Sequence, residues 1–100
     1  MAHIGPRFGD ERDVTPEWLA EVEARDREGL ARLAEQDARG WLASVQSDGN
    51  ARKVCGVSAA YAFSRIHRAL YPKASGELLH WAHAADPAGG EVSFASMRFL

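Results

Sequence analysis

Hydrophobic residues recur at helical spacing between residues 15 and 39, where glutamate and arginine fill the intervening positions. Placed 100° apart, the apolar residues fall within one arc. This arc consists of Trp18, Leu19, Val22, Leu30, Leu33 and Ala34. Thr15 is a suitable N-cap, Pro16 suits the first helical position, and Gly40 suits the position after the helix. The pattern predicts a long amphipathic helix over 15–39.

Three residues interrupt this pattern. Asp26 and Asp37 project into the apolar arc, and Gly29 lies at mid-helix, where glycine costs about 1 kcal/mol relative to alanine. An unbroken helix over 15–39 would be about 36 Å long. We therefore expect either a bend near Gly29 or a helix that extends beyond the core.

The next segment, 41–57, contains a strong turn signal at Asp48-Gly49. Apolar and polar residues alternate before this turn, which favours a β-hairpin over 41–57. A helix that continues through Gln46 is the alternative, because Trp41 also lies on the apolar arc when that arc is extended past Gly40.

A second helix is predicted over 58–71, with Ser58 as its N-cap and Pro72 ending it. Its expected buried face consists of Ala59, Ala62, Phe63, Ile66 and Leu70. Ser75 can cap a third, shorter helix over 75–85, which Asp86-Pro87 would end.

The two ends of the chain are predicted to be extended. Residues 91–99 alternate as a closing strand, and 1–14 hold the turn signals Gly5-Pro6 and Gly9-Asp10, which indicate a loop or a short edge strand. Together these elements predict an α+β fold: a long N-terminal amphipathic helix, two shorter helices, and a small antiparallel sheet made of a hairpin and a C-terminal strand.

Length and composition favour one ordinary globular domain. The chain has 100 residues, of which 46% are hydrophobic and 26% charged. No apolar run approaches the length of a membrane span, and Met1 to Asp10 do not resemble a secretory signal. Cys55 has no second cysteine to pair with, as is usual in a reducing compartment. We expect a cytoplasmic protein.

Charge is distributed unevenly. Residues 1–40 hold ten acidic and six basic residues, whereas residues 41–100 hold four and six. No acid lies between Gly49 and Gly76. The basic residues there are Arg52, Lys53, Arg65, Arg68 and Lys73. They form a positive surface patch if they are exposed together, and are neutralised if Asp26 or Asp37 pairs with Arg52 or Arg65 inside the fold.

The most suggestive arrangement for chemistry is His80, His83 and Asp86. On a helix, residues three apart share a face, so the two histidines and the carboxylate are a candidate metal site. Cys55 and His67 are a second, weaker candidate pair, as nucleophile and base. No phosphate-binding loop or nucleophile elbow is present, so we expect no cofactor and favour a protein that is not an enzyme.

The segment Gly56-Val57-Ser58, followed by a helix that carries Arg65 and Arg68, resembles the turn and recognition helix of helix-turn-helix proteins over about 20 residues. The resemblance implies a DNA-binding regulator that uses the helix from Ser58 to Tyr71. Arg52 and Arg65 depart from the family's pattern, since small and bulky apolar residues are usual there.

These observations favour an interaction protein, either an adaptor or an inhibitor, that binds a larger protein or a protein–nucleic-acid assembly. Small domains of this kind are common among proteins of phages and other mobile elements that act on host proteins. The pattern leaves dimerisation open and indicates no membrane contact. The predicted partner-binding residues are Arg52, Lys53, Tyr61, Arg65, Arg68, Tyr71, Lys73 and Trp81.

Overall fold

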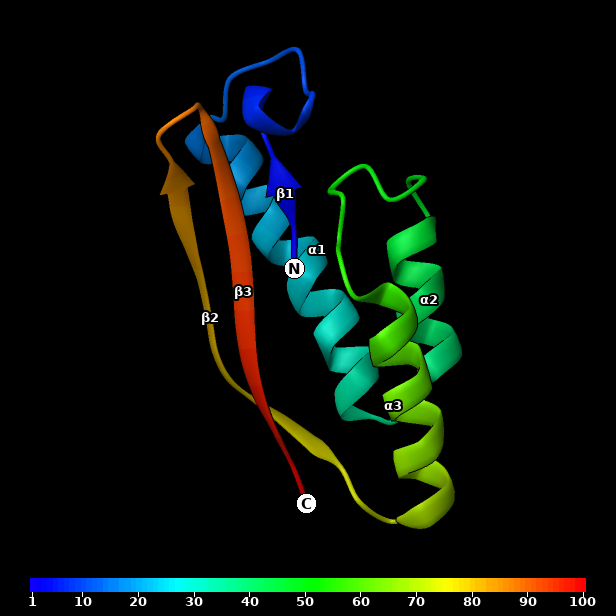
Figure 1. Ribbon diagram of the computed structural model, residues 1–100. Helices are drawn as coiled ribbons and strands as arrows, with labels where there is room; N and C mark the ends of the chain where they lie inside the picture. Colours follow the sequence, from blue (N-terminus) through cyan, green and yellow to red (C-terminus); the bar gives the residue numbers. More distant parts are fainter.

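Three helices and a three-stranded antiparallel sheet make up the computed structural model, which describes all residues from 1 to 100 (Figure 1). The elements are β1 (His3–Ile4), the short 3-10 helix η1 (Pro6–Phe8), α1 (Pro16–Ala34), α2 (Ala38–Gln46), α3 (Val57–Leu70), β2 (Gly76–Asp86) and β3 (Gly90–Phe99). The predicted α+β class is confirmed.

The sheet has the strand order β1-β3-β2, and its long hairpin of β2 and β3 runs along one side of the molecule (Figure 1). The hairpin pairs Gly76 with Phe99 at one end and Asp86 with Gly90 at the other, and a β-bulge interrupts β2 between Leu78 and His80. β1 is a two-residue edge strand against β3. The predicted C-terminal strand and the predicted short edge strand are therefore both observed.

The predicted helix over 75–85 is wrong, because this segment is strand β2. Ser75 does not cap a helix: its backbone exchanges two hydrogen bonds with Leu100, at 3.1 and 3.0 Å. The turn after Asp86 returns the chain antiparallel to itself, so β3 supplies the hydrogen bonds that the local sequence would otherwise satisfy within a helix.

The predicted hairpin over 41–57 is also wrong. Helix α2 runs to Gln46, as the alternative had it, and a loop continues to Gly56. Trp41 and Val45 lie four residues apart on the buried face of α2, and each has an exposed fraction of 1%. The Asp48-Gly49 turn ends this helix instead of joining two strands, since Gly49 N–H donates to the carbonyl of Gln46.

The long helix predicted over 15–39 ends at Ala34. The helical conformation is interrupted at Gln36, and α1 does not bend at Gly29. Gln36 has a φ of 58°, and its side chain donates to the carbonyls of Tyr71 and Ala74 at 3.1 and 2.7 Å. Asp37 then caps α2 by accepting from Gly40 N–H at 2.9 Å. The sharp turn lets α2 fold back against α1.

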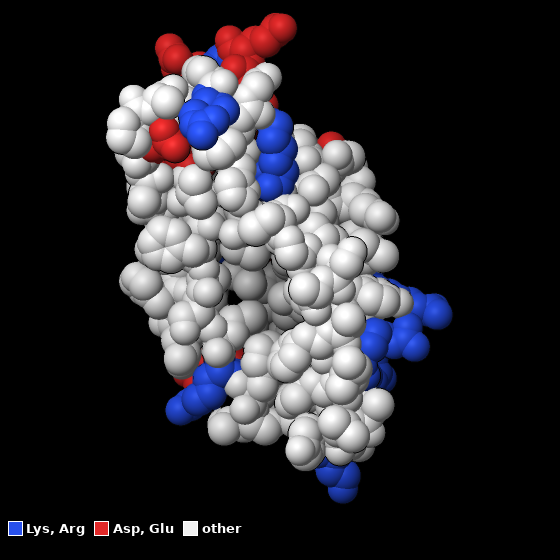
Figure 2. Space-filling model, viewed as in Figure 1, with Lys and Arg blue, Asp and Glu red and all other residues white.

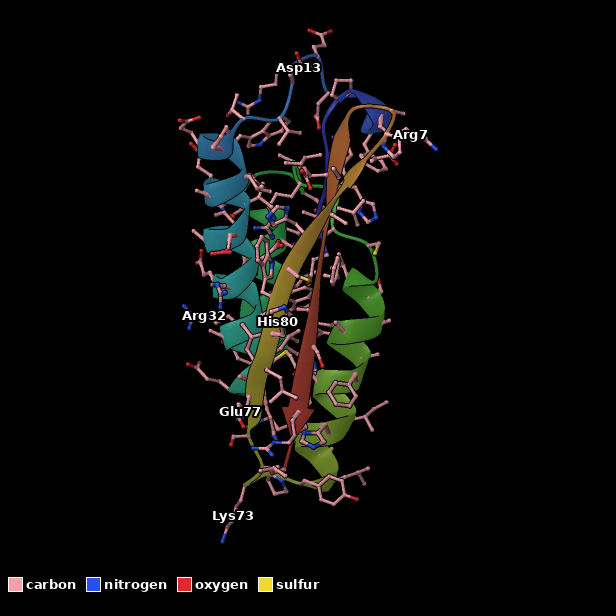
Figure 3. All side chains as sticks on the ribbon, turned by 90° about the vertical axis from the view of Figure 1, so that its left-hand side faces the viewer. Arg7, Asp13, Arg32, Lys73, Glu77 and His80 are labelled. Carbon is pink, nitrogen blue, oxygen red and sulfur yellow. The ribbon has the colours of Figure 1, made fainter.

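Buried apolar residues form two clusters. The larger consists of Leu30, Leu33, Trp41, Val45, Val54 and Trp81. The smaller consists of Ala2, Ile4, Trp18 and Val22. Helix α1 lies against both β2 and α2, and α3 lies against α2, so α1 is central to both clusters (Figures 1 and 3). None of the three helices combines the length and apolar character needed to cross a membrane.

Gly29 lies on α1 where this helix packs against α2. A Cβ atom there would stand 3.0 Å from the Trp41 ring and 3.0 Å from Ser44 Oγ. The absence of a side chain therefore serves the packing of the two helices, which explains glycine in the middle of a helix.

Replacing this glycine tests the packing. Gly29→Ala should lower the free energy of unfolding by about 1–3 kcal/mol, because overpacking against the buried Trp41 ring outweighs the better helix propensity of alanine. Urea denaturation measures the change, with the exposed neighbour Glu28→Ala as control. A variant more stable than the wild type would show that α1 and α2 lie farther apart.

Candidate interaction surface

The apolar stripe of α3 is exposed, although the sequence pattern predicted it to be buried. We call the five residues of this stripe the α3 apolar face. They are Ala59, Ala62, Phe63, Ile66 and Leu70, and all are exposed. Ile66 is 60% exposed and Leu70 65%. The periodicity was that of an amphipathic helix, but the core-facing side of α3 is a different one.

The side of α3 that faces the core is built from small and polar residues. Ser64 is the buried residue of this helix, and Val57, Ala60 and Tyr61 pack against the larger core cluster. Phe63 reaches inward at one edge, where its ring meets that of Phe99 at 4.9 Å. Because α3 contacts the core through Val57, Ala60, Tyr61 and Ser64, its largest aliphatic residues, Ile66 and Leu70, remain in solvent.

Other exposed apolar side chains lie on the same molecule outside α3. They are Tyr71, Leu79, Phe94 and Leu100. Figure 2 shows a broad uncharged face over the sheet and α3, hollowed between them, with charged side chains at its margins. A monomer that remains alone in solution seldom presents so much apolar surface, which makes this face a candidate for contact with another protein.

Three arginines gather beside this face in a cleft of about 490 Å³, which we call the arginine cleft. Its walls are Gln36, Asp37, Ala38, Arg39, Arg65, Arg68 and Ala69. Arg65 donates to the Tyr61 hydroxyl at 2.9 Å, while Arg39 and Arg68 have no carboxylate within salt-bridge distance. Figure 2 shows basic atoms at this edge of the molecule without acidic atoms among them.

The remaining basic residues of 49–76 do not join the arginine cleft, so the stretch is not one continuous patch. Arg52 is buried and pairs with Asp26 at 3.5 Å, as the internal-pairing alternative predicted. Lys53 pairs with Asp10 at 2.8 Å. Lys73 is exposed at the far end of the molecule from Asp13 (Figure 3). Arg52 and Lys53 are thus neutralised within the fold.

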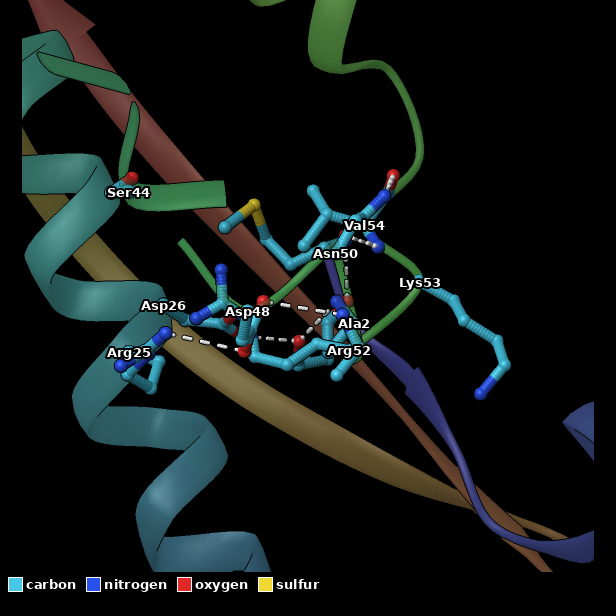
Figure 4. Close-up of polar contacts among 12 residues, drawn as sticks. Ala2, Arg25, Asp26, Ser44, Asp48, Asn50, Arg52, Lys53 and Val54 are labelled. Carbon is cyan, nitrogen blue, oxygen red and sulfur yellow. Dashed lines mark hydrogen bonds and ion pairs between the residues drawn. The ribbon is translucent and has the colours of Figure 1, made fainter. Parts of the chain in front are cut away.

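Asp26 and Arg52 belong to a buried polar network (Figure 4). Asp26 is fully buried, and its Oδ2 accepts hydrogen bonds from Trp81 Nε1, at 2.9 Å, and from the Ser93 hydroxyl. Ser93 Oγ in turn accepts from Ala2 N–H at 2.8 Å. Burial lowers the pKa of the Arg52 guanidinium, and the nearby Asp26 carboxylate acts in the opposite direction.

Of the three aromatic residues among the predicted partner-binding residues, only Tyr71 is exposed, at 59%. Trp81 is a core residue, 7% exposed, because its indole N–H finds a buried partner in Asp26. Tyr61 is half-buried under Arg65, which lies 5.8 Å from its ring centre. The predicted role of Trp81 in partner binding is therefore wrong.

The predicted metal site is wrong as well. His80, His83 and Asp86 lie on a strand, where residues three apart point to opposite faces. His83 faces Glu91, with its Nδ1 3.1 Å from the carboxylate. No three His, Cys, Asp or Glu side chains come together in a way that could hold a metal ion.

The helix-turn-helix resemblance does not extend to the structure. That motif joins two helices by a turn of three or four residues. Here a long loop over 47–56 separates α2 from α3, and Gly56, with a φ of 66°, is the N-cap of α3 rather than part of a tight turn between two helices. Cys55 is exposed in this loop, and His67 contacts Gln36 and Phe99, so the two do not form a nucleophile–base pair.

The chain matches no family model, no curated protein and no solved structure.

The ion pair of Asp26 and Arg52 can be tested by removing one partner. Asp26→Asn should lower the free energy of unfolding by about 3–5 kcal/mol, because it leaves the arginine buried without its counter-charge. The double variant Asp26→Leu/Arg52→Met should cost less than the two single changes together. Denaturation curves measure this coupling. The exposed pair of Glu23 and Arg27 is the control, where Glu23→Gln should cost less than about 1 kcal/mol. Additive changes at the buried pair would contradict the network.

Asp10 should make stability depend on pH. Burial alone would raise its pKa, but hydrogen bonds from Lys53 and from Gly5 N–H lower it below 3.8. Its contribution is therefore present above this value and is lost as the pH falls through the lowered pKa. Asp10→Asn should flatten the decline in stability between about pH 4 and 2, measured by thermal unfolding. Parallel declines in both proteins would contradict the assignment.

Proposed function

We propose that this chain is a non-enzymatic interaction protein, an adaptor or inhibitor, that inserts the α3 apolar face into an apolar groove on a larger protein. The observation that carries the proposal is the exposure of Phe63, Ile66 and Leu70, at 44%, 60% and 65%, on one side of a single helix. Their spacing of i, i+3 and i+7 is that of the anchor residues in helix-in-groove recognition.

Energetics favour a bound state for this helix face. Full burial of a side chain the size of isoleucine or leucine contributes about 1.5–3 kcal/mol. Ile66 and Leu70 still expose more than half of their surface, so most of this free energy remains available to a partner. Since α3 is already a formed helix packed on α2, binding does not have to order it first.

The charges beside the α3 apolar face indicate which kind of partner groove would bind it. Arg65 and Arg68 stand on α3 next to its apolar face and lack a carboxylate partner. An apolar groove with acidic residues along that rim would complement them and speed association. A cytoplasmic location belongs to the same proposal, because Cys55 is a free and exposed thiol.

Substitution of the exposed anchors tests the proposal. Ile66→Ser/Leu70→Ser should leave the free energy of unfolding within about 0.5 kcal/mol of the wild type, since neither side chain is buried. The same variant should lose the partner that the wild type retains in an affinity pull-down from its native cells, run with and without nuclease. Loss of binding without loss of stability would separate docking from folding.

Leu79→Ser is the matched control, because Leu79 is similarly exposed but lies on β2. This variant should retain the partner. Equal retention by the control and the α3 variant would refute docking through α3. Light scattering tests whether a second copy of the chain covers the α3 apolar face. If the wild type is a dimer and the α3 substitutions dissociate it, the partner is a second copy and not a larger protein. Recovery of nucleic acid, with proteins lost after nuclease, would favour DNA binding instead.

A further inference from the structure

We infer that the arginine cleft binds a dianionic phosphoryl group, carried either by a small molecule or by a phosphorylated side chain. The cleft is distinct from the α3 apolar face, although Arg65 and Arg68 also lie on the rim of the proposed docking surface. The inference rests on the arginines of the cleft and does not require docking through α3. Arg39 comes from the first turn of α2, while Arg65 and Arg68 stand three residues apart on α3. The packing of α3 on α2 brings the three arginines to the walls of one cleft.

The charge of the cleft is unbalanced. Asp37 is the acidic residue in its walls, and one carboxylate oxygen of Asp37 is already occupied by Gly40 N–H as the cap of α2. No carboxylate lies within salt-bridge distance of Arg39, Arg65 or Arg68. Three like charges around one cavity repel one another, and a bound dianion removes that repulsion.

A second cleft in the same protein also contains three arginines, and two of them are paired with carboxylates. It has a volume of about 540 Å³ and holds Arg12, Arg25 and Arg52. There Arg25 pairs with Asp48 at 3.2 Å and Arg52 with Asp26 at 3.5 Å. The third arginine, Arg12, lies over the Trp18 ring at 3.8 Å. In the arginine cleft none of the three has a carboxylate partner.

The donors suit a phosphoryl group in particular. Guanidinium is planar and presents paired N–H groups that match two oxygens of one phosphate, which an ammonium group does not. Arg65 is held in place by its hydrogen bond to the Tyr61 hydroxyl at 2.9 Å. A cavity of about 490 Å³ is large enough for a phosphoryl group together with the residue or small molecule that carries it.

Inorganic phosphate is the first probe, titrated by two-dimensional NMR at constant ionic strength with chloride as the replaced anion. Resonances of Arg39, Arg65 and Arg68 should shift along a saturable curve. Arg65→Gln/Arg68→Gln should weaken binding by about tenfold or more, because the charge-assisted hydrogen bonds of two guanidinium groups to the phosphate are lost. Both residues are exposed, so the variant should remain folded.

Arg27→Gln/Arg98→Gln is the matched control, since it removes two exposed arginines from other surfaces. This control should bind phosphate as the wild type does. Shifts that do not saturate, or an equal loss in the control, would overturn the inference. The Ile66→Ser/Leu70→Ser variant should keep its phosphate affinity, so failure of docking and failure of this site are separable.

The carrier is identified by comparing probes. A phosphoserine peptide that binds more tightly than inorganic phosphate, with its unphosphorylated form inactive, assigns the site to a phosphorylated partner. Equal affinity for phosphate and peptide assigns it to a small phosphate compound. Duplex DNA that binds with steep salt dependence, while inorganic phosphate does not bind, would overturn the inference and leave contact with a nucleic-acid backbone.

Discussion

The rest of the fold depends on the hydrogen bonds and the ion pair of the buried Asp26 carboxylate. This carboxylate lies in the middle of α1 with no exposure to solvent, yet it receives Trp81 from β2, Ser93 from β3 and the guanidinium of Arg52 from the loop before α3. Burying one charge without partners would cost several kcal/mol, so these four elements must be in place together. The network and the apolar contacts around it therefore together specify how the sheet, α1 and the loop pack against one another.

Helix α3 is held differently, and this difference explains where the surface is available for binding. Its contacts with the core come from Val57, Ala60, Tyr61 and Ser64. The position of its carboxyl end depends on the Gln36 side chain, which donates to the carbonyls of Tyr71 and Ala74. The large apolar residues of α3, Phe63, Ile66 and Leu70, are not buried by folding and stay exposed. The same placement of α3 against α2 positions Arg65 and Arg68 beside Arg39.

Local sequence signals predicted the elements whose hydrogen bonds are satisfied locally. Thr15 and Pro16 marked the start of α1 correctly, and Pro72 placed the end of α3 to within two residues. The strand β2 was missed because its hydrogen bonds come from β3, and an apolar run such as 78–85 does not distinguish helix from strand. The break at Gln36 was missed because a left-handed glutamine carries no local signal; its side-chain partners lie 31 residues and more along the chain.

The candidate site was predicted in part. Arg65, Arg68 and Tyr71 are exposed as expected, and the pairing of Asp26 with Arg52 followed from a charged residue in an apolar arc. Arg39 was not considered, since only the fold brings it to α3. The spacing of Phe63, Ile66 and Leu70 was recognised as one face of a helix. Periodicity predicts that a helix has an apolar face, but it does not predict whether the fold or a partner buries that face.

The bulge in β2 bears on whether the strand of another molecule can pair with this edge of the sheet. β2 is an edge strand of the sheet and is eleven residues long, with few charges along its centre. An edge of this kind is a template for the strand of another molecule, which is the first step of aggregation. The bulge between Leu78 and His80 interrupts the row of backbone groups, so a foreign strand can keep register with only one part of the edge at a time. The irregularity thus protects an exposed edge at a point where no lysine or proline does so.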